Sequence, residues 1–212
     1  MALTESPGCD LVFYTHPMSR GRIVRWMLEE TGADYRQVLL GYDTSMKEND
    51  YLAINPMGKV PAITHKGHVV TECAAICAYL ADVFPGTGLA PALNERAAYY
   101  RWLFFAAGPL EAAVVNQTLN VSISEEQQRM VGYGHYDLVV DTLATGLSGT
   151  PYIAGDSFTA ADVYVGAHVM WGMQFGSLPK RPEFEAYAAL LADRPALKAA
   201  QAIDDQLAQT EE

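Results

Sequence analysis

The segment of residues 55–73 limits the possible folds of this chain more than any other stretch. Its start contains Pro and Gly, and an apolar run over residues 60–64 follows, which predicts a loop leading into a strand. Residues 65–68 (HKGH) have Gly at the third position and predict a hairpin turn into a second strand over 69–71. A helical run over 74–80 comes next. A proline-bearing strand start, a hairpin and a helix N-terminus are therefore expected close together.

The start of this helix is a candidate ligand site. Its first N–H groups have no partner within the helix and its dipole is positive there, which suits a ligand carboxylate. Glu72, directly before the helix, provides a carboxylate for a ligand ammonium group. Together these groups would bind the zwitterionic end of an amino acid.

The stretch Asn-Pro-Met-Gly-Lys-Val-Pro-Ala at residues 55–62, followed by Glu72 and Cys73, resembles the glutathione transferases. The resemblance implies glutathione as co-substrate. No metal is expected, because Cys73 and Cys77 are two thiols without further ligands. It also implies a cis peptide bond before Pro61, and pairing of the Val60 backbone with the cysteinyl part of glutathione. A proline that merely starts an edge strand is the plain alternative, since an X-Pro bond is cis only about 5% of the time.

Three residues of this motif have expected roles and plain alternatives. Lys59 would reach the glycyl carboxylate of glutathione, or be a surface lysine. Glu72 would hold the ammonium group, or be an acid favoured by the helix dipole. Cys73 stands where the family usually has Ser, so a backbone N–H remains for the γ-glutamyl carboxylate but a hydroxyl contact is lost. The co-occurrence of these signals favours the glutathione site.

The order of elements supports the same fold class. A strand at 11–14, a helix at 20–31 and a strand at 35–40 predict a parallel β-α-β unit with a right-handed crossover. With the hairpin and the helix after it, the order is β-α-β-α-β-β-α, which is the thioredoxin-like arrangement. We therefore expect an α/β thioredoxin-like domain followed by an all-α domain, the glutathione transferase fold.

Breaker residues after Phe84 predict the domain boundaries. The predicted parts are a glutathione-binding domain at 1–84, a linker at 85–92, and a helical domain at 93–212 that contributes the electrophile site. Predicted helices of that domain are 95–119 with a kink at Gly108-Pro109, 124–147, 183–191 and 195–207. Thr159 and Asp162 have the spacing of a capping box.

The resemblance implies a group at the end of the first strand that stabilises the glutathione thiolate. Ser19 is the main candidate, by its spacing after Tyr14 and because the start of a helix adds free N–H groups and a positive dipole. The alternatives are Tyr14 itself and, on a different alignment, Thr15 or His16. A helix-capping role would also explain Ser19.

The second substrate is expected to be an electrophilic, largely apolar small molecule. Aromatic residues crowd two helical stretches of the second half, and Tyr100, Phe104 and Trp171 are the candidates for its site. Most such aromatic residues belong to cores or subunit interfaces, and the surplus fits the homodimer that the family implies.

Composition limits the partners and the compartment. The 212 residues carry a formal net charge of -11, which argues against nucleic acid and anionic membranes as partners. Three cysteines, Cys9, Cys73 and Cys77, suggest free thiols in a reducing compartment, and no secretory signal is recognised, so a cytoplasmic location is expected. The sequence thus predicts a glutathione S-transferase that conjugates glutathione to an electrophile. The alternatives are a glutathione-binding or regulatory protein with weak catalysis, and a glutathione-dependent isomerase, dehalogenase or peroxidase.

Overall fold

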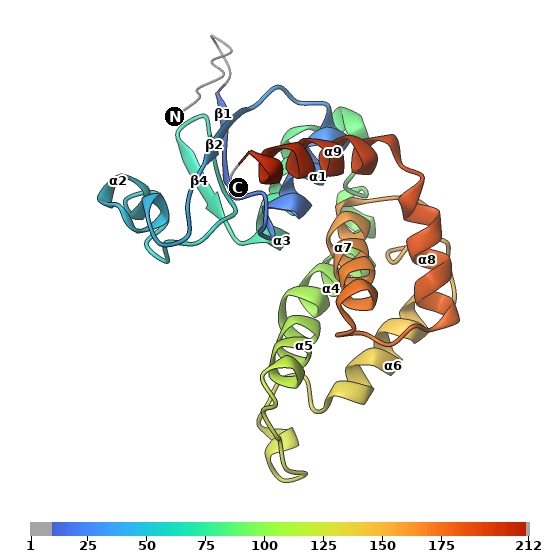
Figure 1. Ribbon diagram of the computed structural model, residues 1–212. Coiled ribbons are helices and arrows are strands. Elements are labelled where there is room, and N and C mark those ends of the chain that lie inside the picture. Colours follow the sequence, from blue (N-terminus) through green and yellow to red (C-terminus); the bar gives the residue numbers. More distant parts are fainter. Residues whose placement is uncertain (1–9, 211–212) are drawn as a thin grey trace. The chain divides into compact units, whose positions relative to one another are not determined.

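The computed structural model describes residues 10–210, so Cys9 lies outside the described residues. The chain forms two compact units, each followed along the chain in Figure 1. The first unit combines Met1–Thr87 with Arg194–Glu212, and the second is Gly88–Asp193.

A four-stranded mixed sheet forms the centre of the first unit. Its strands are β1 (Leu11–Thr15), β2 (Arg36–Leu39), β3 (Ala62–His65) and β4 (His68–Thr71), in the spatial order β2-β1-β3-β4. β1 pairs parallel to β2 and antiparallel to β3, and β3 and β4 form the predicted hairpin. This is the predicted thioredoxin-like sheet.

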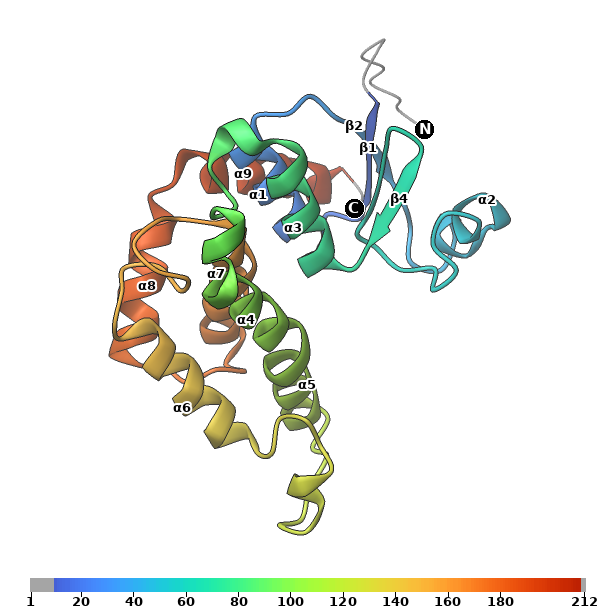
Figure 2. The same cartoon turned by 180° about the vertical axis from the view of Figure 1, so that it is seen from behind.

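Helices α1 (Gly21–Thr31), α3 (Cys73–Val83) and α9 (Pro195–Gln209) complete the first unit (Figure 2). α1 packs against both α3 and α9, and it ends at Gly32 in the left-handed conformation. A short helix, α2 (Asn49–Leu52), and a 3-10 turn, Ser45–Lys47, lie between β2 and β3.

The last helix does not belong to the second unit. The predicted domains grouped all of residues 93–212, whereas the structure packs α9 against α1. Two ion pairs join these helices: Arg25 Nε to Asp204 Oδ1 at 2.8 Å, fully buried, and Arg22 to Asp205 at 2.7 Å. A sequence pattern identifies α9 as a helix but does not identify the surface that it covers.

The second unit is helical throughout its regular elements. Its helices are α4 (Ala97–Phe105), a π-helical turn (Ala106–Leu110), α5 (Glu111–Thr118), α6 (Tyr136–Leu147), α7 (Ala160–Phe175) and α8 (Pro182–Ala192). Short 3-10 turns are Pro85–Thr87 in the first unit, and Leu93–Glu95 and Gln127–Arg129 in the second. The π-helical turn contains Pro109 and lies where the kink was predicted. Within residues 10–210, no helix is long and apolar enough to cross a bilayer.

The predicted helix over 124–147 was wrong in its first half. Gly134 adopts φ 68°, which ends the preceding turn, and α6 begins only at Tyr136. The side chain of His135 caps that start by accepting from the Leu138 N–H at 3.2 Å.

The predicted capping box at the start of α7 is confirmed. The buried Asp162 carboxylate accepts from the Thr159 N–H at 2.8 Å and from its hydroxyl at 3.0 Å. It also accepts from the Ile153 N–H and from the Tyr187 hydroxyl, both at 2.8 Å. Asp162 thus joins a loop, α7 and α8 inside the second unit.

Candidate active site

At one edge of the sheet, β1 and β4 end and β3 begins. Tyr14 pairs with Ala62, and Ala62 pairs with Thr71. The next residues along this row are Thr15 in β1, Pro61 before β3 and Glu72 after β4. The end of the first strand and the motif of residues 55–73, which are far apart in the sequence, therefore meet at one edge of the sheet.

Four consecutive carbonyl groups, from the last residue of β1 into the loop before α1, accept hydrogen bonds. The pairs are Leu40 N–H to Thr15 O at 2.9 Å, Ser19 Oγ to His16 O at 2.7 Å, Arg22 Nε to Pro17 O at 2.5 Å, and Tyr42 OH to Met18 O at 2.9 Å. Four consecutive carbonyls thus accept from residues beyond the loop or at its end, which fixes its conformation. Burial raises the pKa of Tyr42, which keeps this donor protonated at neutral pH.

Ser19, the main predicted candidate, lies half-buried two residues before α1. Its hydroxyl donates to the His16 carbonyl and accepts from the Gly21 N–H at 2.9 Å. The oxygen is therefore polarised by a backbone donor at the helix start, while the hydroxyl hydrogen is donated to a carbonyl of the preceding loop.

The alternative candidates occupy different surroundings. Tyr14 is half-buried and packs on Tyr51, with ring centroids 5.6 Å apart, beside a core cluster of the first unit. Thr15 is fully buried, and its hydroxyl approaches the His16 carbonyl at 3.5 Å. The His16 ring accepts from the Met18 N–H at 3.0 Å and lies 4.5 Å from the Tyr42 ring.

The loop before β3 depends on Asn55, which the sequence analysis did not identify as a positioning residue. This buried side chain donates to the Lys59 carbonyl at 2.8 Å and accepts from the Met57 N–H at 3.1 Å. The Tyr51 hydroxyl donates to the same Lys59 carbonyl at 2.5 Å, and burial raises the pKa of Tyr51 to about 12. The Asn-Pro pair indicates an Asx turn, but it does not show that the amide group of Asn55 donates to the Lys59 carbonyl.

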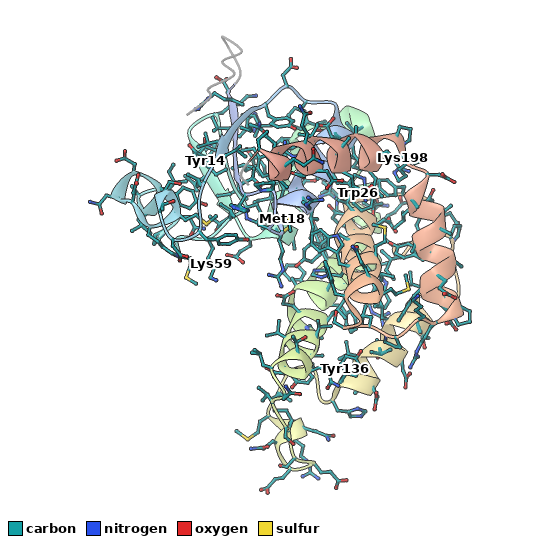
Figure 3. All side chains as sticks on the ribbon, viewed as in Figure 1. Tyr14, Met18, Trp26, Lys59, Tyr136 and Lys198 are labelled. Carbon is teal, nitrogen blue, oxygen red and sulfur yellow. The ribbon has the colours of Figure 1, made fainter. Side chains whose placement is uncertain are left out.

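The same loop carries the backbone features that the resemblance implies. The Val60–Pro61 peptide bond is cis. Gly58 adopts φ 57°, and a Cβ atom there would lie 2.9 Å from the Met46 carbonyl oxygen, so glycine is required. The side chain of Lys59 is exposed. Figure 3 labels Lys59 in this loop, Tyr14 in β1 and Met18 in the loop before α1.

The start of α3 meets the start of α1. The thiol of Cys73, 8% exposed, points to the Arg20 carbonyl at 3.7 Å. Glu72, exposed, adopts φ 66° and ψ 119°, a conformation that is rare for a residue with a side chain and that concentrates at functional sites. The edge therefore combines an exposed carboxylate, two helix N-termini and the Ser19 hydroxyl.

Comparison with known proteins identifies the family. A family model described as the glutathione S-transferase N-terminal domain matches residues 10–82. A glutathione S-transferase of Xanthomonas campestris pv. campestris is 31% identical over 140 residues, which cover 62% of this chain and 68% of that protein. The chain belongs to the glutathione S-transferase family.

Solved structures of similar proteins agree with the assignment of this chain to the transferase family. A sphingomonad glutathione S-transferase in complex with glutathione is 30% identical, with a TM-score of 0.75 over 92% of this chain and 98% of that one. A glutathione transferase from Methylococcus capsulatus is 27% identical, with a TM-score of 0.76 over 92% and 99% of the two chains. The transferase thus shares the thioredoxin-like sheet and the helical part with these enzymes.

The predicted electrophile-site residues of the transferase lie in the second unit. Tyr100 and Phe104, one turn apart on α4, are 42% and 72% exposed. Trp171 on α7 is half-buried. Tyr100 also accepts from Arg96 at 3.2 Å. Across residues 10–210, no group of three or more His, Cys, Asp or Glu side chains is arranged to hold a metal ion.

Proposed function

We propose that the transferase binds glutathione at the edge where β1 and β4 end and β3 begins, and adds its thiolate to an electrophilic, largely apolar small molecule. One observation carries the proposal: the register of the three strands brings Thr15, Pro61 and Glu72 to one edge, from which the chain leads to both helix starts. The relatives support it, because the sphingomonad enzyme is complexed with glutathione.

The proposed glutathione contacts use the groups exposed at this edge. The Val60 main chain would pair with the cysteinyl residue, and Lys59 would hold the glycyl carboxylate. The N–H groups at Cys73 would receive the γ-glutamyl carboxylate, and Glu72 would receive its ammonium group. The exposed side chains of Lys59 and Glu72 support these roles, since neither is committed to the interior.

Ser19 is the proposed thiolate-stabilising residue. A free thiol with a pKa near 8.5 is mostly protonated at neutral pH, whereas the thiolate is the nucleophile. The Gly21 N–H that donates to Ser19 Oγ strengthens this hydroxyl as a donor, and the start of α1 adds positive potential. The thiol proton leaves to solvent, and the sulfur then attacks the electrophilic carbon.

The electrophile would contact Tyr100, Phe104 and Trp171, whose aromatic surfaces suit an apolar molecule. We also propose a cytoplasmic homodimer, and the two free cysteines described, Cys73 and Cys77, support the reducing compartment. Sedimentation of the purified enzyme tests the oligomeric state.

Ultraviolet titration of bound glutathione tests the proposal, because thiolate absorbance reports the thiol pKa directly. We expect the wild type to lower that pKa, and Ser19→Ala to raise it again with little change in glutathione Kd. Turnover of chlorodinitrobenzene should fall in parallel. If Tyr14→Phe raises the thiol pKa and Ser19→Ala does not, Tyr14 is the activating hydroxyl instead.

A second candidate function is glutathione binding without conjugation. It is favoured by one observation, that the Ser19 proton is donated to the His16 carbonyl. Tight glutathione binding with an unshifted thiol pKa would establish this function. A lowered thiol pKa with turnover of other substrate types, and none of chlorodinitrobenzene, would point to isomerisation, dehalogenation or peroxide reduction.

A further inference from the structure

The proposed role of Ser19 creates a conflict over one proton. The Ser19 hydroxyl has a single hydrogen to donate, and in the structure it goes to the His16 carbonyl at 2.7 Å. A thiolate stabilised by Ser19 would need the same hydrogen. The His16 carbonyl would then lose its short hydrogen bond from Ser19.

A second hydroxyl stands next to the same carbonyl. Thr15 Oγ1 lies 3.5 Å from His16 O, at the outer limit of a hydrogen bond. Thr15 is 0% exposed, so water does not compete for its proton. Among the described residues, no other acceptor is hydrogen-bonded to this hydroxyl. The Thr15 hydroxyl is therefore a buried donor whose one hydrogen bond is long and weak.

Gly21 keeps the two hydroxyls close to each other. A Cβ atom at this position would lie 1.9 Å from Thr15 Oγ1 and 2.9 Å from Ser19 Oγ. Both oxygens therefore flank the bare Cα of Gly21 at the start of α1. The Gly21 N–H continues to donate to Ser19 Oγ whichever acceptor receives the Ser19 proton.

We propose that Thr15 is a positioning residue that frees the Ser19 hydroxyl for the glutathione sulfur by taking over the His16 carbonyl. This inference rests on the proposed function of Ser19. In the free enzyme Ser19 donates to His16 O and Thr15 contributes a long, weak bond. When the bound thiol loses its proton, the Ser19 hydroxyl rotates toward the sulfur, and the Thr15 bond to His16 O shortens and replaces the bond from Ser19.

The test compares hydroxyl-bearing and hydroxyl-free side chains at residue 15 by ultraviolet titration of bound glutathione. Thr15→Val keeps the branched shape and removes the donor, so we expect the thiol pKa to rise by about one unit, a tenfold lower thiolate-to-thiol ratio, at nearly unchanged glutathione Kd. Thr15→Ser should restore the wild-type thiol pKa. If Thr15→Val does not fold, Thr15→Ala against Thr15→Ser makes the same comparison without the methyl group.

The Ser19→Ala background separates this role from a structural one. Because Thr15 acts through Ser19, Thr15→Val should cause no further rise in the thiol pKa when Ser19 is already Ala. A wild-type thiol pKa in Thr15→Val, or an equal shift in both backgrounds, would overturn the inference while Ser19→Ala still raises that pKa. If Ser19→Ala itself leaves the thiol pKa unchanged, the proposed function of Ser19 fails and this inference fails with it.

Discussion

Replacing Asn55 should weaken both the first unit and the proposed binding of glutathione. Asn55→Ala removes two hydrogen bonds, one to the Lys59 carbonyl and one from the Met57 N–H. At about 1 kcal/mol each, the free energy of unfolding should fall by about 2 kcal/mol. Tyr51→Phe removes one donor to the same Lys59 carbonyl and should cost about 1 kcal/mol.

The double variant, Asn55→Ala with Tyr51→Phe, shows whether the two donors are energetically coupled. In either single variant the Lys59 carbonyl keeps one of its two donors, and in the double variant it keeps neither. The loss should therefore exceed the sum of the single losses by about 1 kcal/mol. Equilibrium urea unfolding followed by circular dichroism measures each value, and Asn94→Ala, at an exposed site of the second unit, is the control.

The functional consequence follows from the position of this carbonyl, directly before Val60. A less ordered loop must be ordered again on binding, so the Kd of Asn55→Ala for glutathione should rise about tenfold, which corresponds to about 1.4 kcal/mol. Calorimetry on folded protein measures this change. Additive unfolding energies together with a wild-type Kd would refute the reasoning, because they would mean that the two donors act independently and that the order of this loop does not affect glutathione binding.

Three further predictions concern other parts of the chain. Asp162→Ala leaves four donor groups without their acceptor and should lower the free energy of unfolding by about 4 kcal/mol; a loss in urea no larger than that of the exposed Asp141→Ala would contradict this. Glu72→Gln should raise the glutathione Kd about tenfold, whereas the exposed Glu48→Gln should not, and equal Kd values would remove Glu72 from the site. Burial lowers the pKa of His65 below 6.5, so the folded state binds a proton less readily than the unfolded state, and the unfolding free energy should fall as the pH drops below 6.5. In His65→Gln this part of the pH dependence should vanish, and an unchanged pH profile would show that another group causes it.

Features with local causes could be predicted from the sequence. The hairpin of β3 and β4 follows from Gly67 between two β-forming runs, and the cap of α7 follows from the spacing of Thr159 and Asp162. The position of Ser19 before α1 was likewise readable. The helix wrongly extended over residues 124–135 failed for a local reason too, since Gly134 takes a left-handed conformation that outweighed the apolar pattern.

The partners of the site residues could not be predicted in the same way. Tyr42 reaches the Met18 carbonyl across 24 positions, and Asp205 reaches Arg22 across 183. A backbone carbonyl is the same group in every residue, so no side-chain pattern shows which one a distant donor will find. The donors that hold the loop of Ser19 therefore became visible only in the folded chain.

The sequence by itself determined the kinds and order of the elements, the motif from Asn55 to Cys73 and the family, because these depend on side-chain periodicity and neighbouring residues. Tertiary structure decided that α9 covers α1, that Asn55 and Tyr51 share the Lys59 carbonyl, and that the Ser19 proton is already engaged. These facts depend on which groups meet after the strands pair and the helices pack. Hydrogen-bond partners are chosen by distance in space, and spacing along the chain does not specify that distance.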